Sequence, residues 1–114
     1  MIEEYKFGKM VVNGETHEKD LIITKEKIIP NWWRDKGHTL QLQDLKEVLE
    51  EQKPTTLVVG KGKFGMMSVS DEVKNFLREN NIELYEKESG KATQEFNRRY
   101  NTGENIIGAF HLSC

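Results

Sequence analysis

The sequence lacks the features that mark secreted, membrane-spanning and metal-binding proteins. Its single cysteine, Cys114, cannot form a disulfide within the chain, which favours a reducing compartment. No apolar run is long enough for a signal peptide or a membrane span, so we expect a cytoplasmic protein with no membrane partner. Neither sign of charge dominates, because 17 basic residues are interspersed with 19 acidic ones. Binding to nucleic acid through a basic surface is therefore not expected.

Candidate metal ligands and nucleophiles are also few. His111 and Cys114 stand three positions apart in an extended segment, which places them on opposite faces. No second pair of histidines or cysteines completes a zinc site, so we predict no metal site. The same geometry argues against Cys114 as a nucleophile with His111 as its base, and no other spacing indicates a catalytic pair.

The chain of 114 residues can bury one hydrophobic core but not two, so residues 1–114 should form a single domain. Asn13-Gly14 between two short strand-like stretches predicts an N-terminal β-hairpin. Helix and strand patterns then alternate, which predicts an α/β sandwich with a mixed sheet and helices packed on it. The expected strands are 9–12, 15–17, 21–24, 28–29, 55–59, 82–84 and 106–112, and the expected helices are 43–53, 71–79 and 89–102.

Residues 57–73, LVVGKGKFGMMSVSDEV, place three glycines with G-x-G-x-x-G spacing between a strand and a helix. A dinucleotide site needs the third glycine close to the start of the helix, where free N–H groups meet the pyrophosphate. Here the best helix cap is Ser70, about a turn and a half beyond Gly65. The spacing therefore argues against a dinucleotide site, and we predict no cofactor.

A small anion remains an alternative ligand for this loop. Loops at the carboxyl ends of strands bind ligands in open α/β sheets, and Lys61, Gly62 and Lys63 stand on such a loop. Tyr100 and Asn101, near the end of the last helix, are the residues that would face the loop and complete a polar pocket. The alternative is that the glycines only let the chain leave a central strand tightly.

The stretch NWWRDKGHT, residues 31–39, has neither a helical nor a strand period and predicts an irregular loop. Exposed tryptophan and arginine are enriched in binding hot spots, so Trp32, Trp33 and Arg34 are candidate partner-binding residues. A buried tryptophan that closes one end of the core is an equally good interpretation.

Five stretches occur in the order that is found in one small family: FGKMVVNG, NWWRDKGH, LVVGKGKFGMMSVS, KATQEFNRRYN and IIGAFHLSC. The chain resembles this single-domain family of unknown biochemical function, which includes archaeal hypothetical proteins, a mammalian adipogenesis-associated protein and a mitochondrial complex I assembly factor. The resemblance implies a three-layer α/β fold around a mixed five-stranded sheet, and no established catalytic activity. The family positions that match here are Trp33, Gly60, Gly62, Thr93, Tyr100, Asn101 and His111.

Two functional hypotheses follow. The preferred one is a non-enzymatic interaction or assembly module, a monomer or a weak homodimer, that binds an unknown protein partner through the Trp-Arg loop. The other is a small-molecule or anion-binding protein, including an undescribed enzyme, that uses the glycine-rich loop at 60–65 and the end of the last helix.

Overall fold

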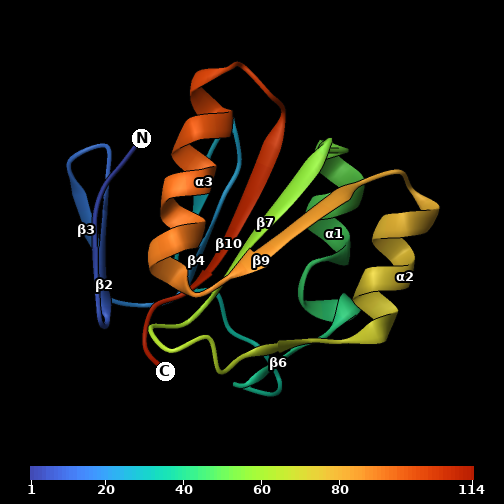
Figure 1. Cartoon of the computed structure of the whole chain (residues 1–114), viewed down its shortest axis with the longest axis horizontal. Helices are drawn as coiled ribbons and strands as arrows, with labels where there is room; N and C mark the ends of the chain where they lie inside the picture. Colours follow the sequence, from blue (N-terminus) through green and yellow to red (C-terminus); the bar gives the residue numbers. More distant parts are fainter.

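Ten strands and three α-helices build the fold (Figure 1). The computed structural model describes residues 1–114. In chain order the elements are β1 (Ile2–Lys6), β2 (Lys9–Val12), β3 (Glu15–His17), β4 (Leu21–Ile23), β5 (Ile28–Ile29), β6 (Thr39–Leu40), a 3-10 helix (Leu42–Asp44), α1 (Lys46–Gln52), β7 (Thr56–Lys61), β8 (Ser68–Val69), α2 (Asp71–Glu79), β9 (Glu83–Lys87), α3 (Ser89–Asn101) and β10 (Ile106–His111). Strands open the chain and helices and strands then alternate, as the sequence predicts.

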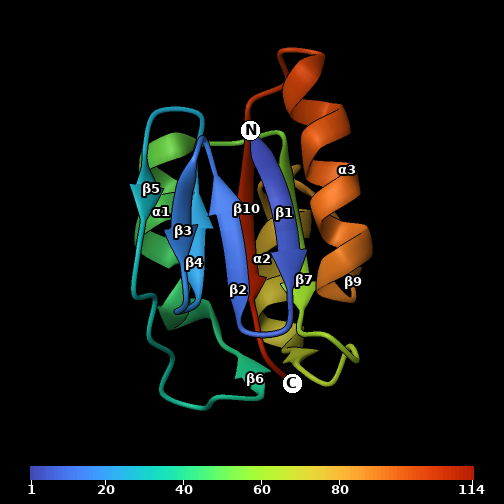
Figure 2. The same ribbon diagram turned by 90° about the vertical axis from the view of Figure 1, so that its left-hand side faces the viewer.

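The central sheet has five strands in the order β5-β4-β10-β7-β9. It is mixed, because β10 is antiparallel to β4 and parallel to β7, and β7 is parallel to β9. β1, β2 and β3 form a separate antiparallel sheet. Figures 1 and 2 show three layers, with α1 and α2 on one face of the central sheet and α3 with the small sheet on the other. The predicted three-layer α/β fold and its N-terminal hairpin are confirmed.

Side chains of the central strands alternate between two buried clusters, one on each face of the sheet. Leu57 and Val59 of β7 pack on the side of α1 and α2, whereas Val58 packs on the side of α3. On that second side, Phe110 of β10 meets Phe96 of α3 edge to face, with ring centroids 5.8 Å apart. Because both faces are covered, β7 is the continuous apolar strand that the sequence pattern indicated.

Helix boundaries follow local capping rules. Ser70 accepts a hydrogen bond from the first turn of α2 and begins that helix, as predicted. The first predicted helix, 43–53, is shorter than expected, because a 3-10 turn precedes α1 and Lys53 ends α1 in the left-handed conformation. β1 was not predicted, since its residues show no regular alternation. None of the helices is long and apolar enough to cross a membrane.

Candidate functional site

Three loops gather at the carboxyl ends of β7 and β10, around the end of the chain (Figure 2). The Gly8 N–H, in the turn between β1 and β2, donates to the Leu112 carbonyl at 2.8 Å. The Lys63 N–H, in the loop between β7 and β8, donates to the Ser113 carbonyl at 2.7 Å. The third loop, residues 30–38, is held beside the second by a backbone hydrogen bond from β8. The C-terminal segment therefore fixes the relative positions of loops from distant parts of the chain.

The four large apolar side chains that the fold leaves exposed all stand on these three loops: Phe7, Trp33, Phe64 and Met66. We call the surface that they form the loop-tip face. Trp33 is the most exposed of the four, at 76%. Beside it lies a depression of about 500 Å³. Single exposed apolar residues are ordinary, but their concentration at one end of a domain is typical of a contact surface.

The Trp-Arg stretch divides between the surface and the interior. Trp32 is buried, and its indole N–H donates to the Asp44 carbonyl at 3.2 Å. Arg34 is also buried, with its guanidinium carbon 4.7 Å from the centroid of the Trp32 ring. The core-closing interpretation therefore applies to Trp32. Of the three candidate partner-binding residues, only Trp33 is free to meet a partner.

Beneath the loop-tip face, Asp20 connects three parts of the chain. Its Oδ1 accepts from the Leu112 N–H at 2.8 Å. Its Oδ2 lies 2.8 Å from His111 Nδ1 and 2.9 Å from Arg34 Nη2. Arg34 Nη2 also donates to the Gly37 carbonyl at 2.9 Å, within its own loop. We call Asp20, Arg34 and His111 the buried polar cluster.

The hydrogen bonds of this cluster place the proton of His111 and keep Asp20 ionised. His111 Nδ1 also lies 3.1 Å from Arg34 Nη2, but one nitrogen cannot donate to Asp20 and accept from Arg34 at once. The shorter contact, to a carboxylate, assigns the proton to Nδ1. Burial raises the pKa of the Asp20 carboxyl, but hydrogen bonds from His111 and the Leu112 N–H, with the nearby positive charges, outweigh burial and hold this pKa below its usual value. Asp20 is therefore an anion at neutral pH.

Part of the buried polar cluster has no hydrogen-bond partner within the protein. Arg34 Nε, Arg34 Nη1 and His111 Nε2 are buried and unpaired, although buried polar atoms are nearly always paired. The side chains of Arg34 and His111 are only 3% and 9% exposed. Exposed His38 lies edge-on to His111, with ring centroids 6.0 Å apart. The unpaired nitrogens therefore lie close to the surface without reaching it. Stacking on Trp32 offsets part of the cost of burying the Arg34 guanidinium, but His111 has no such contact with Trp32.

The predicted anion donors on the glycine loop are already engaged. The Gly62 N–H donates to Ser89 Oγ at 2.9 Å, and the Lys63 N–H is bound to the C-terminal segment. The Lys61 ammonium lies 3.1 Å from a carboxylate oxygen of Glu86. These internal contacts remove the physical argument for an anion cradle on this loop.

Gly62 instead allows the C-terminal segment to approach closely. Its φ is +93°, and a Cβ at this position would stand 2.7 Å from the Ser113 carbonyl oxygen and 2.9 Å from His111 Cδ2. Ser89 completes the junction, because its hydroxyl donates to the His111 carbonyl at 2.5 Å. The interpretation that the glycines let the chain leave β7 tightly is the one that this geometry supports.

Tyr100 and Asn101 lie at the opposite end of the sheet from Lys61. α3 begins at Ser89, beside the glycine loop, and its 13 residues run away from that loop at about 1.5 Å per residue. Tyr100 stacks on Phe96, with ring centroids 6.1 Å apart, and Asn101 is exposed. The structure therefore does not bring these two residues together with the loop, and the predicted shared pocket is not formed.

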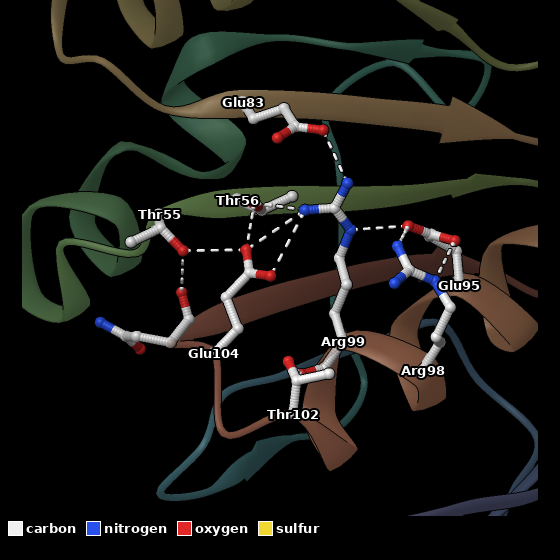
Figure 3. A network of polar contacts seen from close by, with 9 residues as sticks. Thr55, Thr56, Glu83, Glu95, Arg98, Arg99, Thr102 and Glu104 are labelled. Carbon is white, nitrogen blue, oxygen red and sulfur yellow. Dashed lines mark hydrogen bonds and ion pairs between the residues drawn. The ribbon is translucent and has the colours of Figure 1, made fainter.

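A second polar network surrounds the end of α3, at the amino ends of β7 and β9 (Figure 3). Arg99 lies 2.6 Å from carboxylate oxygens of Glu83 and Glu95 and 3.2 Å from one of Glu104. Glu104 also accepts hydrogen bonds from two threonine hydroxyls. Hydrogen bonds from Arg98 and Arg99 lower the pKa of Glu95 to about 2. Because every charged group in this network lies beside an opposite charge, the network holds α3 to the sheet and offers little to a ligand.

Sequence reasoning missed Asp20 and gave His111 no structural role. Nothing in the pattern distinguishes Asp20 from the other acidic residues, since it stands outside any motif. The available signal for His111 was its place among the positions that match the family. A polar residue at the end of the last apolar strand, in a chain with only three histidines, also indicated a special environment.

The fold and the loop-tip face together define a small three-layer α/β domain with one apolar end. The chain belongs to a family described as protein of unknown function (DUF498/DUF598), whose model matches residues 2–111. The predicted membership of a small family of unknown biochemical function is confirmed.

Solved structures of similar proteins agree with this assignment. A conserved hypothetical protein, PH1505 from Pyrococcus horikoshii OT3, is 25% identical with a TM-score of 0.84, and the match covers 100% of this chain and 99% of that one. A Bordetella parapertussis protein is 16% identical with a TM-score of 0.86, covering 99% and 95% of the two chains. A Mth938-like domain from Bordetella pertussis is 13% identical with a TM-score of 0.79, covering 98% and 85%. The two Bordetella matches show the shared fold alone.

Proposed function

We propose that this domain is a non-enzymatic interaction module that binds a protein partner on the loop-tip face. One observation carries the proposal: the large apolar side chains left exposed by the fold stand on three loops at one end of the sheet. Aromatic side chains of this kind supply most of the binding energy in protein interfaces. The hydrogen bonds to Leu112 and Ser113 hold two of the loops in place before binding, which lowers the entropy lost on association.

Site-specific photo-cross-linking in the native host tests this proposal. A photoreactive amino acid placed at Trp33 or Phe64 should give the same discrete protein adduct. The same group at Thr102, an exposed residue at the other end of the sheet, should give none. The purified partner should then lose at least about tenfold in affinity for the Trp33→Ser variant. If positions 33 and 64 give no adduct, or only those also formed at 102, the proposed function is wrong.

A second candidate function is the binding of a small oxyanion by the buried polar cluster. The observation that favours it is the two unpaired nitrogens of the Arg34 guanidinium, Nε and Nη1. A guanidinium presents paired N–H donors to carboxylate or phosphate, and such a ligand would enter when the loop 30–38 moves.

Thermal unfolding with phosphate, sulfate, acetate and citrate tests this second function. A ligand at about 100 times its dissociation constant should stabilise the protein by roughly 2.7 kcal/mol, which raises the melting temperature by several degrees. The Arg34→Lys variant, which keeps the charge but not the fork of donors, should lose the shift. A flat response of the wild-type protein removes this candidate and leaves the first one untouched.

A further inference from the structure

Lysines accompany the exposed aromatic side chains of the loop-tip face. Lys6 precedes Phe7, Lys63 precedes Phe64, and Lys36 follows Trp33 on the same loop. The three lysines are exposed, and none of them makes an ion pair. Elsewhere around this end of the sheet a lysine ammonium is neutralised, as Lys61 is by Glu86.

Few carboxylates oppose these lysines. On the three loops the only acidic residue is Asp35, and it already accepts a hydrogen bond from Gln43 at 2.8 Å. Glu18 and Asp20 both line the depression beside Trp33, together with Lys19. The Asp20 carboxylate is already engaged by Arg34, His111 and the Leu112 N–H. The loop-tip face therefore presents three unpaired ammonium groups beside apolar side chains, while the neighbouring carboxylates of Asp20 and Glu88 accept hydrogen bonds within the protein.

We propose that the partner segment bound by the loop-tip face is acidic and carries large apolar side chains. This inference rests on the proposed function. Apolar side chains of the segment would cover Trp33 and Phe64, and its carboxylates would meet Lys36 and Lys63. An uncharged polar part of the segment would enter the depression of about 500 Å³, whose lining is mostly polar. Complementary charge of this kind raises the association rate and excludes basic competitors.

The shape and charge of the face favour a protein segment over an anionic membrane. A flat bilayer surface would leave the depression beside Trp33 unfilled. It would also place lipid phosphates against Glu18 and Asp35, where a protein segment can present uncharged side chains. The face therefore fits a discrete chain better than a continuous anionic surface.

Selection of random peptides displayed on phage tests the inference. The full chain is immobilised through its N-terminus, which lies at the opposite end from the loops, so that the loop-tip face stays free (Figure 2). Bound peptides are compared between the wild-type protein and the Trp33→Ser variant. The inference expects peptides that require Trp33 and are enriched in Asp and Glu beside large apolar residues.

Charge reversal then separates the inference from the proposed function. The Lys36→Glu/Lys63→Glu variant should bind the selected peptides at least about tenfold more weakly, and added salt should weaken wild-type binding in the same direction. The matched control is Lys25→Glu/Lys46→Glu, which reverses two exposed, unpaired lysines outside the face and should change affinity less than about twofold.

Each other outcome overturns a defined statement. The selected peptides can require Trp33 but show no acidic enrichment, and bind the charge-reversed variant equally well. That outcome overturns the acidic partner and still supports the loop-tip face as a docking surface. Absence of any Trp33-dependent peptide counts against both. Sedimentation of the wild-type protein, but not of Trp33→Ser, with phosphatidylserine vesicles would replace the protein partner by a membrane.

Discussion

An arginine lies close to the core at each end of the central sheet, but the two arginines differ in burial and in the number of their charged partners. At the amino ends of β7 and β9, Arg99 meets three carboxylates and its side chain is 14% exposed. At the carboxyl ends, Arg34 meets one carboxylate, that of Asp20, and is 3% exposed. Two nitrogens of Arg34 and one of His111 are left unpaired there. The more deeply buried arginine therefore has fewer partners.

The network around Arg99 is typical of a stabilising contact, whereas the region around Arg34 is typical of a binding surface. Around Arg99 the charges satisfy one another, so another molecule has little to add. Around Arg34 the burial cost of a charge is only partly compensated, and the loops above it expose aromatic side chains. Proteins tolerate such local costs chiefly where a binding surface requires them. The comparison thus favours function at the carboxyl ends and stability at the amino ends.

The largest effect that tests this comparison is expected from Arg34→Ala. Removal of the buried guanidinium leaves the half-buried Asp20 carboxylate without this cation, and it frees the Gly37 carbonyl. We expect a loss of about 3–5 kcal/mol in the free energy of unfolding, measured by urea denaturation. Arg99→Ala, at the more exposed network, should cost less. Equal losses for the two variants would contradict the proposed difference between the ends.

Gly62→Ala tests the tight junction beneath the loop-tip face. The substitution forces a Cβ to within 2.7 Å of the Ser113 carbonyl oxygen at a φ of +93°, so we expect a loss of about 1–3 kcal/mol. Gly14→Ala is the matched control, because Gly14 has a φ of +80° but open space around its Cβ position. The control should cost no more than about 1 kcal/mol in the same urea experiment. An equal cost at both positions would show that the close approach contributes nothing.

A smaller effect is expected at acid pH from the amino-end network. The folded-state pKa of Glu95 is about 2, below the value near 4.3 of an unfolded chain. Its contribution is therefore present above about pH 4.3 and is lost as the pH falls toward about 2. Because these ion pairs are largely solvated, Glu95 should account for less than about 1 kcal/mol of the stability that is lost over this pH range. The Glu95→Gln variant should not show that part of the loss.

Chemical denaturation between pH 2 and pH 6 gives the curve, and NMR titration of Glu95 gives its pKa directly. The Asp20 carboxyl, whose pKa is also lowered, should lose its contribution as the pH falls below the ordinary range of an aspartate. The Glu95→Gln variant isolates the amino-end part of the loss. An unchanged curve in that variant would contradict the assigned pKa of Glu95.

The smallest expected effect on stability is that of Trp33→Ser. Trp33 is 76% exposed and has no core contact to lose, so the free energy of unfolding should change by less than about 0.5 kcal/mol. Trp32→Ser, one position earlier, removes a buried ring and should cost about 3–5 kcal/mol. Thermal or urea unfolding of the pair measures the contrast. A large loss in Trp33→Ser would mean that the ring supports the fold and is not free for a partner.

Much of the fold was predictable because its elements follow local rules. The Asn13-Gly14 turn, the Ser70 cap and the apolar run of β7 each indicated the correct element from neighbouring residues alone. β1 escaped prediction because its residues pair with β2 and α3 without a regular alternation of their own. Local patterns therefore sufficed except where a strand depends on distant contacts.

The site was less predictable, because its residues are joined only by the fold. Asp20 and His111 are 91 positions apart, and no local pattern couples them. Likewise, adjacent Trp32 and Trp33 have opposite exposures, which depend on how the loop lies against Asp44. The pairing of the glycine loop with Tyr100 failed for a related reason. The 13 residues of α3 place Tyr100 far from the glycine loop. The sequence motifs alone could not show this distance.

The position of β10 also affects how the chain is made. β10 is the last of the five strands in the chain, yet it lies between β4 and β7 in the sheet. A ribosome therefore synthesises β4 and β7 before β10, the strand that joins them. Pairing of Ile23 with Gly108 spans most of the chain, which slows closure. Until β10 has been synthesised, the edges of β4 and β7 that it covers have no partner strand.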